Sequence, residues 1–144
     1  SRTYLYRISP KKNVFSFDFA YHFKPFLDVD KMNNACKILF EYTDFECFSK
    51  VNTDVKTFNC KIMEAHWKQV DDEFHFTIKA DRFLRNMVRA VVGTMINIGT
   101  GKIAVDDLHA IIKSKNRSEA GCSVPAHALY LTKIDYPEQI KVHG

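Results

Sequence analysis

The sequence predicts an α+β domain in which a mostly antiparallel sheet carries helices packed on one face. Two observations predict this class. Segments whose apolar residues alternate with polar ones, as in half-buried strands, are interspersed with segments whose apolar residues recur every three or four positions, as in amphipathic helices. Their order is strand, strand, helix, strand, strand, helix, helix, strand. The 144 residues contain no repeat and no linker, so we expect one domain over residues 1–144.

The first third of the chain contains two expected strands and a helix. Thr3–Ser9 alternates Tyr and Ile with polar residues, and Val14–Phe23 alternates aromatic residues, so both segments are predicted to be extended. Asp30 is placed as the N-cap of the helix that follows. The helix is indicated by apolar residues at i, i+3, i+4 spacing, namely Met32, Ala35, Cys36, Leu39 and Phe40.

The middle of the chain predicts an antiparallel hairpin. Val55–Val70 is expected to be a long strand, and Glu73–Ala80 alternates without interruption through three apolar residues. Two aspartates at positions 71 and 72 form the turn. The apolar phase of the first strand slips by one residue between Ile62 and Met63, which predicts a β-bulge at that point.

Two helices and a strand are expected in the last third. Asp81 is predicted to cap a helix over Arg82–Ile98, which ends at a Gly-Thr-Gly sequence. A shorter helix is predicted over Val105–Lys113, with its apolar residues facing inward. After a loop, the alternation that begins at Leu129 predicts a final strand that ends at Pro137.

Charge and cysteine content narrow the class of protein. The net charge of +4 permits binding to a polyanion, although a solvated lysine-rich surface explains the same number. The spacing of Cys36, Cys47, Cys60 and Cys122 matches no metal site, so we expect no metal and reduced, mostly buried thiols in a cytoplasmic protein. No apolar run approaches the roughly 20 residues of a membrane helix, so no membrane partner is expected.

The helix predicted over Arg82–Ile98 offers the strongest candidate binding surface. Arg82, Arg85 and Arg89 have i, i+3, i+7 spacing, which places them on one helix face opposite the apolar residues. Small residues lie beside these arginines and would let a bulky partner approach, namely Asn86, Ala90 and Gly93. Since arginine can hold carboxylate or phosphate through two hydrogen bonds, the face suits an anion. From periodicity alone, a solvated basic face is slightly favoured.

Four sequence strings resemble the TruA-type tRNA pseudouridine synthases. Residues 83–93 resemble the motif F-L-x-x-M-V-R-x-x-V-G of that family, which is a specific signature. Residues 115–121 are similar to its K-D-R-x-x-A-G segment, and residues 125–131 are similar to the end of its A-P-A-x-G-L-x-L segment. Residues 2–6 are similar to its R-x-Y-x-Y strand. The resemblance covers nearly the whole chain, with Asn116 in place of the usual Asp and Ala128 in place of the usual Gly.

This resemblance implies an activity and a set of site residues. Members of the family convert uridine to pseudouridine in the anticodon arm of tRNA, at positions thirty-eight to forty, with no cofactor and no metal. An aspartate attacks the nucleotide, and the uracil detaches, turns and rejoins through carbon. By similarity, Arg89 pairs with this catalytic aspartate and Tyr4 packs on the flipped base. Arg82, Arg85 and Arg117 are the implied RNA-binding residues.

The catalytic aspartate of the family lies in an R-T-D-A-G segment that this sequence lacks. We therefore expect a C-terminal half whose partners are tRNA, the N-terminal half of the same protein and, as in the family, a second copy in a homodimer. On its own the chain is expected to be inactive. Two alternatives remain open at this point: an RNA-binding module without chemistry, and a protein-interaction domain whose arginine helix docks on an acidic partner.

Overall fold

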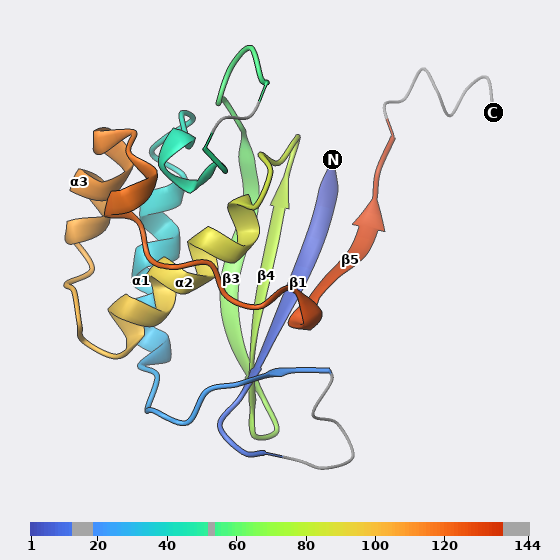
Figure 1. Ribbon diagram of the computed structural model, residues 1–144. Coiled ribbons are helices and arrows are strands. Elements are labelled where there is room, and N and C mark those ends of the chain that lie inside the picture. The colour runs from blue at the N-terminus through green and yellow to red at the C-terminus, as the bar shows by residue number, and fades with distance from the viewer. Residues whose placement is uncertain (13–18, 52–53, 137–144) are drawn as a thin grey trace.

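The computed structural model describes residues 1–12, 19–51 and 54–136, and it has the predicted α+β architecture (Figure 1). A five-stranded sheet lies on one side and the helices pack together on the other. The strands are β1 (Arg2–Ser9), β2 (Tyr21–His22), β3 (Ile62–Val70), β4 (Glu73–Ala80) and β5 (Leu129–Ile134). The α-helices are α1 (Val29–Leu39), α2 (Met87–Gly99) and α3 (Asp107–Ser114). Short 3-10 turns are η1 (Glu46–Phe48), η2 (Arg117–Glu119) and η3 (Ala126–Ala128).

The first strand, β1, organises the sheet. It pairs in antiparallel fashion with β4 from Arg2 to Ile8 and with β5 from Arg2 to Tyr6. The short strand β2 pairs parallel to the end of β1, at Ile8 and Ser9. The sheet order is β2-β1-β4-β3, with β5 beside β1 on the same edge as β2. Because the described part of the chain begins and ends in neighbouring strands, its two ends lie close together, as Ser1 and Asp135 show with a 2.7 Å hydrogen bond.

The predicted hairpin and its bulge are confirmed. The β3–β4 register shifts between Ile62 and Glu64, where one extra residue enters β3. The strand begins at Ile62, however, and not at Val55. The residues just before it are held by another partner: Asn59 forms an isolated bridge with Asp44. This bridge joins the residues just before β3 to the segment just before η1.

The beginning of α1 and the segment before it differ from the sequence prediction. The N-cap is Asp28 and not Asp30, because the Asp28 carboxylate accepts a 3.1 Å hydrogen bond from the backbone N–H of Lys31. Of the strand predicted over Val14–Phe23, the described residues form only β2, and residues 13–18 lie outside the described part of the chain. Pro137, the predicted end of the last strand, also lies outside it.

The core lies between the helices and the face of the sheet that carries Tyr6 and Ile8. The same face of β4 contributes apolar side chains at alternate positions, namely Phe74, Phe76, Ile78 and Ala80. The predicted inward face of α3 is confirmed, since its three apolar residues Leu108, Ile111 and Ile112 are buried. Three of the four cysteines are buried as predicted, and burial raises the pKa of Cys36 and Cys47 to about 12. The fourth, Cys122, is exposed.

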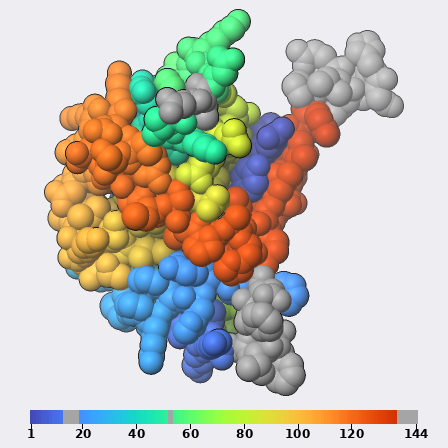
Figure 2. Space-filling view, in the orientation of Figure 1, coloured from blue at the N-terminus to red at the C-terminus, as the bar shows by residue number. Residues whose placement is uncertain are grey.

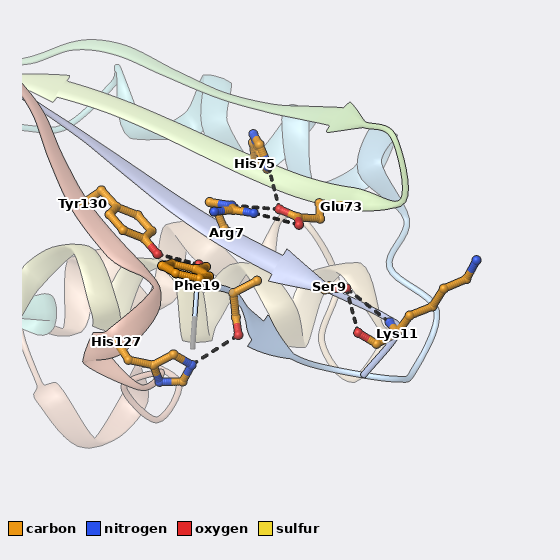
Figure 3. A network of polar contacts seen from close by, with 9 residues as sticks. Arg7, Ser9, Lys11, Phe19, Glu73, His75, His127 and Tyr130 are labelled. Carbon is orange, nitrogen blue, oxygen red and sulfur yellow. Dashed lines mark hydrogen bonds and ion pairs between the residues drawn. The ribbon is translucent and has the colours of Figure 1, made fainter. Parts of the chain in front are cut away.

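The opposite face of the sheet carries a polar network (Figure 3). Arg7 donates two 2.8 Å hydrogen bonds to the Glu73 carboxylate, which also lies 3.0 Å from the His75 ring. The bond from Arg7 holds the pKa of Glu73 below its usual range, and burial opposes this effect. In the same view the Tyr130 hydroxyl donates a 2.6 Å bond to the Phe19 carbonyl, which ties β5 to the segment before β2.

No helix in the described residues is long and apolar enough to cross a membrane.

Candidate functional site

The helix that carries the Met-Val-Arg sequence begins later than predicted. It starts at Met87, because Asn86 has a left-handed backbone conformation (φ 69°) that cannot lie inside a right-handed helix. Asp81, the predicted cap, instead accepts a 2.7 Å hydrogen bond from the backbone N–H of Lys61, at the base of the β3–β4 hairpin. The prediction of one helix over Arg82–Ile98 is therefore wrong for its first five residues.

This late start separates the three arginines that periodicity placed on one helix face. Only Arg89 belongs to α2. Arg82 lies in the preceding loop, where its Nη1 donates 3.1 Å bonds to the carbonyls of Thr57 and Asn59. Arg85 is exposed in the turn just before the helix. The arginine stripe of the sequence prediction does not exist as a helix face, and the three side chains have different surroundings.

The small residues on α2 make room for the chain itself and not for a partner. A methyl group added at Gly93 would lie 1.8 Å from the carbonyl oxygen of Cys122. A methyl group added at Gly121 would lie within 2.8 Å of the Gly93 backbone. Both glycines are needed because two stretches of backbone touch at this point. The segment 121–125 therefore packs directly on α2, and in Figure 1 it runs across the front of the helix towards β5.

The 121–125 segment fixes the position of Arg89. The Arg89 Nε donates a 2.7 Å hydrogen bond to the carbonyl of Val124, whose own N–H donates to the Arg89 carbonyl at 3.2 Å. The Asn86 amide donates a 2.5 Å bond to the Ser123 hydroxyl, and the Tyr6 hydroxyl donates a 2.7 Å bond to the carbonyl of Pro125. These contacts use only one nitrogen of the guanidinium. Among the described residues, no carboxylate forms an ion pair with Arg89.

Arg89 and Tyr4 line one cleft of about 420 Å³ at the N-terminal end of α2. Tyr4 comes from β1 and packs edge-on against Phe83, with ring centroids 5.0 Å apart and the planes at 88°. Leu129 of β5 and the exposed Arg85 also line the cleft. In Figure 2 the yellow-green atoms before and at the start of α2 reach the surface between the green segment before β3 and the orange segment before β5.

The positive charge of Arg89 also acts on the buried surroundings of the cleft. Burial raises the pKa of the Tyr6 hydroxyl above its usual value, the neighbouring Tyr21 raises it further, and the charge of Arg89 lowers it. A guanidinium held through one nitrogen, with no acid paired to it in the described chain, suits a planar anion that accepts two hydrogen bonds. The aromatic rings beside it suit a flat apolar group.

The structure brings together some of the predicted site residues and separates others. Arg89, Tyr4 and Arg85 share the first cleft. Arg117 lines a second, adjoining cleft of about 830 Å³. Arg82 lines neither cleft.

Sequence reasoning missed two residues at these clefts. Lys50 lines both of them, and Ser123 links the wall of the second cleft to Asn86. Neither residue stands in a periodic or motif-like setting that would have marked it. In the described residues no group of three or more His, Cys, Asp or Glu side chains is placed to hold a metal ion.

The comparisons with known proteins all find tRNA pseudouridine synthases. Residues 35–137 match a family model described as tRNA pseudouridine synthase. The chain is 51% identical over 140 residues to tRNA pseudouridine synthase A of Parabacteroides distasonis, which covers 97% of this chain and 56% of the relative. It is 51% identical over 141 residues to the enzyme of the same name from Bacteroides fragilis, with the same coverage. The Bacillus pumilus enzyme is 37% identical over 138 residues, which is 94% of this chain and 56% of the relative. The chain thus spans about half the length of the curated relatives it matches.

Proposed function

Since this chain belongs to the tRNA pseudouridine synthase family, we propose that it is the C-terminal half of an enzyme that isomerises uridine to pseudouridine in tRNA. The observation that carries the proposal is the first cleft, where Arg89 lies beside the aromatic side chain of Tyr4 without a carboxylate partner in the described chain. A cation fixed in this way, in a chain that spans 56% of its relatives, calls for an acid from the remaining part. The domain assignment follows: residues 1–144 form one half, and an N-terminal half supplies the nucleophile.

Each residue of the cleft has a proposed role in the isomerisation. The family resemblance assigns the nucleophile to an aspartate of the N-terminal half. We propose that the free nitrogens of Arg89 hold this carboxylate against the target nucleotide while Val124 fixes the guanidinium plane. The flipped uracil packs on Tyr4, whose ring is braced by Phe83. Flipping a nucleotide out of its stack costs a few kcal/mol, which these contacts offset. After the glycosidic bond breaks, the base must turn within the cleft, so the ring of Tyr4 offers a surface without directional bonds.

The remaining arginines are proposed to bind the RNA backbone, Arg85 and Arg117 directly and Arg82 less directly. Arg85 is exposed at the rim of the first cleft and Arg117 lines the second. The Nη1 of Arg82 already lies within hydrogen-bonding distance of three oxygens in the 57–59 loop, so we expect Arg82 to support RNA binding mainly by holding that loop. The target positions in the anticodon arm, the homodimer and the cytoplasmic location are part of the same proposal and rest on the family resemblance.

The test joins this chain to the N-terminal half of the Parabacteroides distasonis relative. Release of tritium from tRNA labelled at carbon 5 of uridine reports the isomerisation, because that hydrogen is lost when the new bond forms. We expect release by the joined protein, none by the 144-residue chain alone, and none when the aspartate of the R-T-D-A-G segment is changed to asparagine. Light scattering of the joined protein tests the homodimer.

Two outcomes would contradict the proposal. Release of tritium by the chain alone would mean that it carries its own nucleophile. A joined protein that unfolds cooperatively and binds tRNA, yet releases no tritium, would instead support an RNA-binding module without chemistry.

A further inference from the structure

A second cleft of about 830 Å³ lies next to the proposed active site and has no role in the reaction described above. Its walls come from η1 and the residues after it, from Phe58 before β3, and from residues 115–123 around η2. Lys50 lines both clefts, so the two lie side by side at this residue. An RNA strand with one nucleotide in the first cleft would pass Lys50 to reach the second.

The second cleft carries positive charge that the described protein neutralises only in part. Arg117 donates hydrogen bonds to two neutral acceptors, the Gly121 carbonyl at 3.0 Å and the Ser123 hydroxyl at 2.8 Å. Within the described residues, neither Arg117 nor Lys50 forms an ion pair, while Lys115 lies 3.5 Å from Asp44. Against these three cations the lining contains one carboxylate, that of Glu46. A rigid guanidinium without a carboxylate suits a phosphate group.

The remaining lining suits the other parts of a nucleotide. Phe58 offers an aromatic side chain at the cleft wall, and bases stack on such rings regardless of sequence. The Ser123 hydroxyl accepts bonds from Asn86 and Arg117, so both of its acceptor sites are used and its own proton is left to donate. The Glu46 carboxylate can accept a hydrogen bond from a ribose hydroxyl or a base amino group.

We propose that the second cleft binds the nucleotide next to the target uridine, with its phosphate between Arg117 and Lys50 and its base against Phe58. This inference rests on the proposed function, because it assumes that the first cleft holds a flipped nucleotide. An RNA strand fits better than an acidic protein segment, since the cleft combines cations, hydroxyl groups and an aromatic ring and lies beside the first cleft. Lys50 would then contact both nucleotides, because it lines both clefts.

Cys122 provides a direct probe of this cleft. It lines the second cleft and is exposed, whereas the other three cysteines are buried. We would measure the rate of its alkylation by iodoacetamide with and without an anticodon-arm RNA, in the 144-residue chain and in the joined protein. RNA at ten times its dissociation constant, measured separately by fluorescence anisotropy, is expected to slow the alkylation about tenfold by mass action.

Two variants that remove the same charge at different positions test whether Lys50 contacts the RNA. Lys50→Gln should weaken the protection and reduce the slope of log affinity against log salt by about 0.7, the value for one phosphate contact to a single strand. Lys113→Gln removes the same charge from an exposed position on α3, outside both clefts, and should leave the slope unchanged. Lys50 is chosen over Arg117 because the Arg117 side chain also holds the 121–125 segment in place.

Three results would overturn the inference. If RNA binds and tritium is released but Cys122 is alkylated at its free rate, the second cleft is empty while the proposed function stands. If Cys122 is already protected in the joined protein without RNA, the cleft is an interface between the two halves. If neither protein binds the RNA, the inference and the proposed function fail together.

Discussion

Replacing Arg89 by alanine would remove two contacts of different kinds. One is the 2.7 Å hydrogen bond from Nε to the Val124 carbonyl, and the other is the proposed pairing with the carboxylate of the N-terminal half. A hydrogen bond to a charged group contributes about 1.5–3 kcal/mol to stability, so the free energy of unfolding should fall by an amount in that range. Leaving a buried carboxylate unpaired costs about 3–5 kcal/mol, which corresponds to two to four orders of magnitude in rate.

Two further variants separate charge from geometry. Arg89→Lys keeps the positive charge, but a single ammonium group cannot bond to Val124 and also present two parallel donors to a carboxylate. We therefore expect the Arg89→Lys variant to react less than about tenfold faster than Arg89→Ala. Arg85→Ala removes an arginine from the same cleft and serves as the control. It should weaken tRNA binding and leave the rate at saturating tRNA nearly unchanged.

The assay is the single-turnover rate of tritium release by the joined protein at saturating tRNA, together with urea unfolding of each variant. If Arg89→Ala reacts within about threefold of the unmodified protein, the loss is under roughly 1 kcal/mol and Arg89 does not hold the nucleophile. If unfolding shows that the variant has lost its structure, Arg89→Lys alone decides the question, because its charge and length remain close to those of arginine.

Three other predictions concern stability and binding. Gly93→Ala should lower the free energy of unfolding by about 3 kcal/mol or more in urea, because its methyl group would lie 1.8 Å from the Cys122 carbonyl; a loss below about 0.5 kcal/mol would mean that the two backbones are not in contact. Glu73→Gln should lower the free energy of unfolding by about 1 kcal/mol at neutral pH, because Glu73 and Arg7 are each about a quarter exposed and solvent weakens their ion pair. Because the pKa of Glu73 is lowered in the folded protein, the difference in the free energy of unfolding between the variant and the unmodified protein should be complete above pH 4.5. It should disappear as the pH falls through the pKa of Glu73 in the folded protein. A difference in stability that is constant with pH would refute the ion pair. Tyr4→Phe should retain most of the turnover and Tyr4→Ala should lose it, because only the ring is needed for packing; equal activity of the two variants would remove Tyr4 from the site.

The repeating patterns of the sequence predicted most of the fold. Alternation located β1, β4 and the start of β5, and the phase slip at Ile62 located the bulge, because both follow directly from which face of the sheet a side chain occupies. The start of α2 could not be predicted in this way. Leu84 continues the apolar spacing of the helix, while Asn86 has a left-handed conformation and bonds through its side chain to Ser123, which is 37 residues away in the sequence. Periodicity records local spacing and contains no information about such a distant contact.

The candidate site was predicted in part. The family motifs named Arg89 and Tyr4, and the structure places both in one cleft, although they come from a helix and a strand far apart in the chain. The prediction that three arginines lie on one helix face was wrong, because it assumed an uninterrupted helix. Which cysteine is exposed could not be predicted, because Cys122 has its backbone against a glycine of α2 while its side chain is exposed. Lys50 could not be found, since a single lysine after η1 has no local pattern.

The attachment of the 121–125 segment limits how its length can vary. Each of its five residues has its own partner in another part of the chain: Thr94, Gly93, Asn86, Arg89 and Tyr6, in the order of the segment. Inserting or deleting one residue would shift every later residue to the wrong partner, and a tied segment has no spare length to absorb the change. Surface connections usually tolerate such changes well. Here we expect the spacing between η2 and β5 to be as restricted as the register of a strand, because the same residues that connect the two elements also position the arginine of the cleft.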